Sequence, residues 1–171
     1  WTKWRSFCGT GHTCQPKADH APQVLTPRRP GPPPWQAKME GMNPATTPQI
    51  ETVLRTLPHG IRLSCRVAGP EGAPVLMFVH GFPEGAFVWD ALLQHFATPL
   101  NGGFRCIAPD MRGYGLSSAP TEVSQYRARH LVQDLEALIA FETTDRHGGT
   151  LAGLVAHDWG GAVAWNLANQ Q

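Results

Sequence analysis

Residues 151–161 read LAGLVAHDWGG, and this stretch decides the fold. It begins as a short apolar run, which is typical of a buried strand, and residues 161–171 continue as an apolar helix. Little chain is left for the turn between them, so the backbone must bend sharply at Asp158. The small residues two positions before and after it, Ala156 and Gly160, permit the close packing that such a turn needs. The pattern predicts a strand that passes directly into a helix, with Asp158 held outward.

A carboxylate at such a turn has two interpretations. It lies at a helix N-terminus, where main-chain amides and the helix dipole stabilise its ionised form. An ionised, fixed and projecting carboxylate is a competent nucleophile for covalent catalysis. Aspartate is also a frequent N-cap, and in that role it only stabilises the helix end. The spacing alone favours neither interpretation for Asp158.

Strands and helices alternate along the rest of residues 49–171. The predicted strands are 51–57, 61–68, 75–79, 104–108 and 151–156, the first two forming a hairpin, and the predicted helices are 87–97, 126–141 and 161–171. In the predicted helix 126–141 the apolar residues share one face, and the residues opposite them are polar and include Asp134. This alternation predicts an open α/β sheet with mostly parallel strands, whose chemistry lies at the carboxyl ends of the strands.

Two more strand ends carry unusual sequence. His-Gly-Phe-Pro occupies residues 80–83, and Pro-Asp-Met-Arg-Gly-Tyr-Gly occupies residues 109–115. Together with His-Asp-Trp-Gly-Gly at 157–161, these motifs resemble the α/β-hydrolase family, and within it the epoxide hydrolases. The resemblance runs from about residue 51 to residue 171. It implies the N-terminal half of an α/β-hydrolase fold through its nucleophile elbow, with the cap domain and later strands missing.

The resemblance also implies a mechanism. Asp158 attacks an epoxide carbon to form an alkyl-enzyme ester, which water hydrolyses to a diol. The main-chain amides of Phe82 and Trp159 form the oxyanion hole, and both residues contact the substrate. The remaining motif residues, which shape this site, are His80, Gly81, Pro83 and Gly160. The implied partner is a small epoxide, and no cofactor or metal ion is implied.

Other residues in these motifs are expected to be structural. Asp110 and Arg112 are expected to pair with each other or to cap local backbone. His157 is expected in the core because side chains alternate along a strand, and Trp165 because it lies on an apolar helix.

Two alternatives stay open. Haloalkane dehalogenases share the Asp nucleophile and the adjacent Trp but usually have Asn where Phe82 stands, so Phe82 favours epoxides. A non-catalytic scaffold is the second alternative, because residues 159–171 contain no His, Asp or Glu to act as the base and its partner. We therefore expect this chain to be a fragment of an enzyme that is inactive in turnover, although Asp158 can in principle be alkylated once, with strand 151–156 as an unprotected sheet edge.

The first 48 residues are of a different kind. They hold more than half of the 16 prolines, and we expect them to be disordered, with the partial hydrolase domain at 49–171. Because the first methionines are Met39 and Met42, we expect translation to start at one of them, with residues 1–38 not natural coding sequence. The potential metal ligands here lack the spacing of a zinc site, so none is predicted; they are Cys8, His12, Cys14 and His20.

Composition excludes several classes of protein. A net charge of +1, with 16% charged residues, excludes a nucleic-acid binder that works through bulk positive charge. The sequence has no apolar run long enough to predict a transmembrane helix. Cys65 and Cys106 lie in apolar runs and are expected to be buried, reduced thiols, which favours a cytoplasmic location.

Overall fold

The computed structural model describes residues 47–143 and 149–170 of the 171-residue chain. Nearly all of segment 1–48 therefore lies outside the described residues, with its expected start sites and its four potential metal ligands. The expected disorder of this segment and the domain boundary after residue 48 stay predictions.

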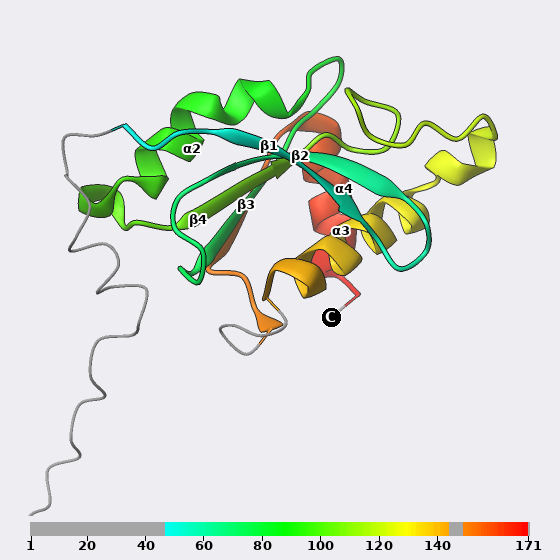
Figure 1. The fold of residues 1–171 in the computed structure, drawn as a ribbon. Helices are drawn as coiled ribbons and strands as arrows, with labels where there is room; N and C mark the ends of the chain where they lie inside the picture. Colours follow the sequence, from blue (N-terminus) through cyan, green and yellow to red (C-terminus); the bar gives the residue numbers. More distant parts are fainter. Residues whose placement is uncertain (1–46, 144–148, 171) are drawn as a thin grey trace, which may run out of the picture. The chain divides into compact units, whose positions relative to one another are not determined.

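The described residues form a mixed five-stranded sheet with the order β1-β2-β4-β3-β5 (Figure 1). The strands are β1 (Glu51–Thr56), β2 (Arg62–Ala68), β3 (Val75–Val79), β4 (Arg105–Pro109) and β5 (Gly153–Ala156). β3 pairs in parallel with β4 and β5, whereas β2 pairs antiparallel with β1 and β4. All five predicted strands are confirmed to within two residues at each end, and β5 lies at a sheet edge as expected.

The helices also follow the predicted order, with shifted boundaries. They are α2 (Asp90–Ala97), α3 (Ala128–Thr143) and α4 (Asp158–Ala168), with short 3₁₀ helices η1 (Ala86–Trp89), η2 (Pro99–Asn101) and η3 (Val123–Tyr126). The predicted helix 87–97 is thus divided between η1 and α2. α4 begins three residues earlier than predicted, because the Gly161 N–H donates a 3.1 Å hydrogen bond to the His157 carbonyl and closes the first turn there.

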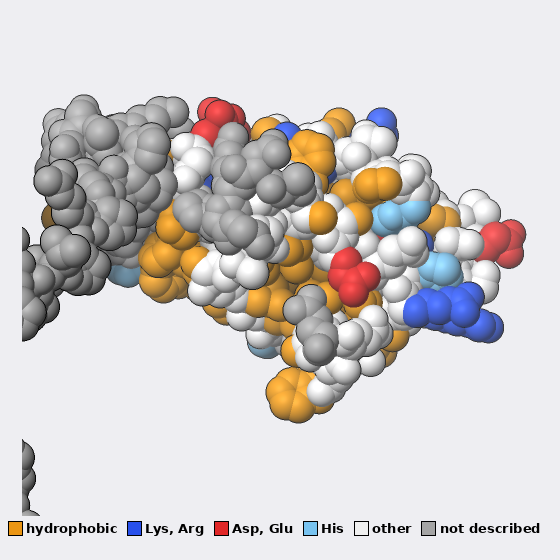
Figure 2. Space-filling view, turned by 90° about the horizontal axis from the view of Figure 1, so that it is seen from below, with side chains coloured by type: hydrophobic (Ala, Val, Ile, Leu, Met, Phe, Trp, Pro, Cys, Tyr) orange, Lys and Arg blue, Asp and Glu red, His pale blue; other side chains and the backbone are white. Residues whose placement is uncertain are grey.

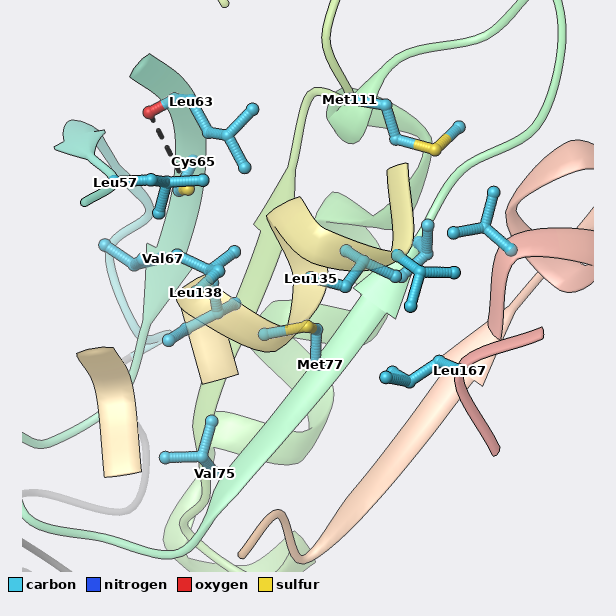
Figure 3. Packing of buried hydrophobic residues seen from close by; sticks show 14 residues of the cluster. Leu57, Leu63, Cys65, Val67, Val75, Met77, Met111, Leu135, Leu138 and Leu167 are labelled. Carbon is cyan, nitrogen blue, oxygen red and sulfur yellow. Dashed lines mark hydrogen bonds between the residues drawn. The ribbon is translucent and has the colours of Figure 1, made fainter. Parts of the chain in front are cut away.

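Helices cover both faces of the sheet (Figure 1). α3 and α4 pack on the face to which Val75, Met77 and Val79 point, and Figure 3 shows this core. α2 packs on the opposite face, where Phe78 lies in a cluster with Leu93. Alternate side chains of β3 therefore enter two different cores, which explains why this strand is apolar throughout.

The two cysteines of the described region are buried free thiols, as predicted. Burial raises the pKa of both Cys65 and Cys106 to about 12. Both therefore stay protonated at neutral pH and act as small apolar core residues.

The prediction of a core position for Trp165 is wrong, because its side chain is 73% exposed. α4 packs through Val163 and Leu167, which lie on one helix face, and Trp165 lies midway between them on the opposite face. Hydrophobic side chains also spread over the surface seen in Figure 2. None of the helices in the described ranges is long and apolar enough to cross a membrane.

Candidate active site

The chain passes from β5 to α4 within a single residue. β5 ends at Ala156, His157 is extended, and α4 begins at Asp158, whose φ of +49° lies in the left-handed region. Among the described residues, Asp158 is the only one besides glycine with a positive φ. Such a conformation costs on the order of 1–3 kcal/mol and tends to occur at functional sites. The turn presents the Asp158 side chain to solvent.

Gly160 makes this turn sterically possible. A Cβ at this position would lie 2.5 Å from the carbonyl oxygen of Val79 and would also overlap that of His80. These are backbone atoms at the end of β3, and they cannot move aside as a flexible side chain could. Only glycine therefore lets the start of α4 approach the carboxyl end of the neighbouring strand.

Two main-chain amides act on the carboxylate of Asp158. The Phe82 N–H donates a hydrogen bond to Oδ1 at 2.9 Å, and the adjacent Trp159 N–H stabilises the ionised form electrostatically. The Phe82 and Trp159 amides lower the pKa of Asp158 below its ordinary value. Desolvation opposes them, and the charge of His157 makes the smallest contribution, which also lowers this pKa. The group is therefore an ionised, accessible and fixed carboxylate at neutral pH.

The loop that follows β3 brings the Phe82 amide to this position. His80 is fully buried beneath the loop, and Pro83 follows Phe82 through a cis peptide bond. The Met111 N–H donates to Nε2 of His80 at 3.0 Å, and Nδ1 of His80 lies 2.8 Å from the carbonyl oxygen of Gly81. His80 thus connects the loop after β3 to the loop after β4.

A largely apolar cavity of about 400 Å³ opens beside the two amide donors. Its lining residues are Phe82, Met111, Arg112, Tyr114, Tyr126, Leu131, Trp159 and Val163. The side chains of Phe82 and Trp159 are 64% and 60% exposed and form its rim. A cavity of this size and character suits the apolar part of a small organic molecule.

Residues 74–171 match the family described as the alpha/beta hydrolase fold. The chain belongs to the α/β-hydrolase family. Strand β3, the parallel strands beside it and the turn at Asp158 all lie within the matched residues.

Several relatives of this α/β hydrolase carry the name epoxide hydrolase. Epoxide hydrolase A of Mycobacterium tuberculosis is 41% identical over 63% of this chain and 31% of its own length. The AB hydrolase superfamily protein YfhM of Bacillus subtilis is 40% identical over 65% of this chain and 36% of its own length. The crystal structure of epoxide hydrolase VrEH1 from Vigna radiata matches with a TM-score of 0.62 and 37% identity, over 70% of this chain and 36% of that chain. The chain spans about a third of the length of these relatives.

Asp110 and Arg112 have separate partners in this α/β hydrolase. Oδ1 of Asp110 accepts a hydrogen bond from the Ala86 N–H at 2.7 Å. Asp110 therefore caps local backbone at the start of η1, as one of its two predicted roles has it, and does not pair with Arg112. Arg112 is buried and donates to both carboxylate oxygens of Asp134, at 2.6 and 2.7 Å. Nε2 of His59 lies 2.7 Å from the same carboxylate.

Asp134 is buried, with only 3% of its surface exposed. The prediction that it belongs to the polar residues opposite the apolar face of helix 126–141 is therefore wrong. The sequence spacing does indicate the buried position. Asp134 follows Leu131 by three residues and precedes Leu138 by four, so all three lie on the same face of the helix. A buried carboxylate at such a position requires a cationic partner, and Arg112 supplies it.

The expectation that His157 lies in the core is also wrong. Its side chain is 61% exposed, and Nδ1 lies 3.3 Å from Oε2 of Glu84. His157 is extended and continues the alternation of β5, in which Ala156 packs against the core. His157 therefore shares the other side of this edge strand with the exposed Val155, and its ring lies beside the loop that follows β3.

Both tyrosines of the chain line the cavity, a role that the sequence did not indicate. The hydroxyl of Tyr126 donates to the Pro120 carbonyl at 2.8 Å. Burial, together with the negative charge of Asp158, raises the pKa of Tyr114. In the described ranges there is no cluster of three or more His, Cys, Asp or Glu that could hold a metal ion.

Proposed function

We propose that Asp158 is the nucleophile of an epoxide hydrolase and that this chain supplies its oxyanion-hole donors. The observation that carries the proposal is the convergence of the Phe82 and Trp159 amides on one exposed carboxylate. The low pKa of Asp158 keeps that carboxylate ionised, and attack by a carboxylate requires no proton to be removed first. Relatives named epoxide hydrolase support an epoxide as the substrate.

The first step forms an ester. Because Oδ1 of Asp158 accepts the Phe82 N–H, we assign the attack to Oδ2. Oδ2 bonds to a ring carbon of the epoxide, the bond between that carbon and the ring oxygen breaks, and the ring oxygen takes a proton from solvent water, which is left as hydroxide. The ester retains every atom of the substrate, whose apolar substituent occupies the cavity beside Phe82 and Trp159.

The second step releases a diol. Water attacks the carbonyl carbon of the ester, and negative charge develops on the oxygen held by the Phe82 and Trp159 amides. The bond between that carbon and the ester oxygen Oδ2 then breaks. The departing oxygen takes one proton of the attacking water, the other proton goes to the hydroxide left by the first step, and the diol and the Asp158 carboxylate are released. Preorganised donors of this kind are each worth about 3–4 kcal/mol of transition-state stabilisation. Neither step transfers electrons to an acceptor, so the proposed reaction needs no redox cofactor.

Trapping of the ester tests this proposal. The chain is mixed with styrene oxide, quenched in acid at a series of times, and analysed by intact mass and by peptide mapping. We expect a mass increase equal to one styrene oxide, mapped to Asp158, or release of phenylethanediol if the ester hydrolyses. Asp158→Asn, which keeps the shape of the side chain but removes its charge, is the matched control and should give neither.

A parallel incubation with 1-chlorohexane separates the alternatives. A haloalkane dehalogenase would gain a hexyl group at Asp158 with release of chloride, and that result without any reaction with styrene oxide would overturn the choice of substrate. No adduct and no product with either reagent would support the non-catalytic scaffold. An adduct at a residue other than Asp158 would contradict the assignment of the nucleophile.

A further inference from the structure

We propose that His80 is a positioning residue that polarises the peptide group between Gly81 and Phe82. This inference rests on the proposed function, because that peptide group supplies the N–H that contacts Asp158. His80 itself touches neither the carboxylate nor the cavity.

The contacts form an unbroken chain from the loop after β4 to the carboxylate. The Met111 N–H donates to Nε2 of His80 at 3.0 Å, and Nδ1 of His80 lies 2.8 Å from the Gly81 carbonyl oxygen. The same peptide group carries the Phe82 N–H, which donates to Oδ1 of Asp158 at 2.9 Å. The Gly81 oxygen also accepts the Glu84 N–H at 3.1 Å, so His80 is the shorter of its two contacts. One peptide group therefore accepts hydrogen bonds on its oxygen, from His80 and Glu84, and donates one to Asp158 from its nitrogen.

This arrangement determines the protonation state of the imidazole. A backbone N–H can only donate, so the Met111 contact requires Nε2 to be an unprotonated acceptor. A neutral imidazole then carries its hydrogen on Nδ1, where it donates to the Gly81 carbonyl oxygen. If His80 were an imidazolium, its Nε2–H would face the Met111 N–H, and two hydrogen-bond donors would then oppose each other. His80 is fully buried, so water does not take over either contact.

Polarisation is the physical consequence. A carbonyl oxygen that accepts a hydrogen bond makes the N–H of its own peptide a better donor, and such chains strengthen each bond by roughly 10–30%. The donor from His80 also holds the plane of the peptide, so that its N–H stays aimed at Asp158. Both effects strengthen the contact that lowers the pKa of Asp158.

Two substitutions separate this role from simple packing. In His80→Asn the amide nitrogen lies near the position of Nδ1 and keeps the donor to Gly81. In His80→Gln the amide oxygen lies near the position of Nε2 and keeps the acceptor for Met111 but removes the donor to Gly81. A residue that only fills space would respond similarly to both changes.

NMR on the full chain measures the effect directly. Glycine labelled at its carbonyl carbon and phenylalanine labelled with ¹⁵N select only Gly–Phe peptides, which occur at 81–82 and 103–104. The Phe104 N–H donates to the Phe96 carbonyl, far along the chain from His80, and is the internal control. We expect His80→Gln to move the Phe82 amide proton upfield and to raise the pKa of Asp158, whereas His80→Asn leaves both near their wild-type values.

The wild-type chain gives a second measurement that does not depend on the stability of either variant. With ¹⁵N-labelled histidine, we expect His80 to show a protonated Nδ1 and an unprotonated Nε2. A hydrogen on Nε2, or equal changes at Phe82 in both variants, would overturn the proposal. None of these readouts requires an epoxide, so failure of the alkylation experiment would refute the proposed function without deciding the role of His80.

Discussion

Gly81 lies directly against Asp158, although Gly81 belongs to the loop after β3 and Asp158 begins α4. A Cβ on Gly81 would be 2.5 Å from the Cβ of Asp158 and 2.8 Å from its Oδ1. Real Cβ atoms essentially never show distances this short. The absence of a side chain at residue 81 is therefore what allows the Phe82 amide to reach the carboxylate.

Gly81→Ala should displace Asp158 and weaken its hydrogen bond with the Phe82 N–H. A displacement of about 1 Å in a reacting group costs roughly 100-fold in rate, so we expect a loss of that order in alkylation by styrene oxide. The initial rate of adduct formation, followed by intact mass, measures it. Gly161→Ala is the control, because a Cβ there meets nothing within 4 Å. Equal rates in Gly81→Ala and wild type would contradict the packing argument.

The adjacent glycines of α4 should respond in opposite ways to alanine. Gly160→Ala places a methyl group against the backbone at the end of β3, and overpacking of this kind costs about 1–3 kcal/mol in the free energy of unfolding. Gly161→Ala meets open space, and replacing a helical glycine with alanine contributes up to about 1 kcal/mol. Urea denaturation followed by circular dichroism measures both changes. Destabilisation by Gly161→Ala would contradict this prediction, because it would show that a Cβ at residue 161 meets neighbouring atoms.

His157→Gln should raise the pKa of Asp158. The histidine lowers that pKa through its charge, and glutamine removes the charge while keeping a polar side chain. Because only the ionised carboxylate attacks, the acidic limb of the pH–rate profile for alkylation should move to higher pH. His95→Gln is the control, since His95 is an exposed residue of α2, which packs on the face of the sheet opposite to α4. An unchanged acidic limb in His157→Gln would mean that the two amides alone determine this pKa.

The two partners of Asp134 should differ in their importance for stability. Asp134→Asn leaves the buried guanidinium of Arg112 without its counter-charge, and breaking a buried ion pair in this way costs about 3–5 kcal/mol. His59→Gln removes only a partly exposed contact, and such pairs contribute about 0–1 kcal/mol. Chemical denaturation of both variants gives the comparison. A loss from His59→Gln as large as that from Asp134→Asn would contradict this ranking.

The strands and the principal helices could be predicted because their signals are local. The apolar run at β3 and the spacing of Leu131, Leu135 and Leu138 each depend on residues close together in the sequence. The same holds for the turn at Asp158, where the short connection between strand and helix forces a sharp bend and the small residues on both sides permit the close packing that it needs. Membership of the α/β-hydrolase family followed from three short motifs at strand ends, which the comparison with known proteins confirms.

Contacts between segments far apart in the chain could not be derived in the same way. Sequence spacing identified Arg112 as a motif residue but not Asp134 as its partner, because that pair depends on how α3 packs against the loop after β4. The exposure of Trp165 depends on which face of α4 meets the sheet, and an apolar helix gives little indication of that.

The sequence by itself thus determined the order of strands and helices and the position of the carboxylate at the turn, since backbone sterics and hydrophobic periodicity act over a few residues. Only the tertiary structure decided that the Phe82 amide meets Asp158 and that His80 connects two loops beneath it. Those contacts form because parallel pairing of β3 with β4 and β5 brings three strand ends to one edge of the sheet. The geometry of the site is therefore a property of the assembled sheet.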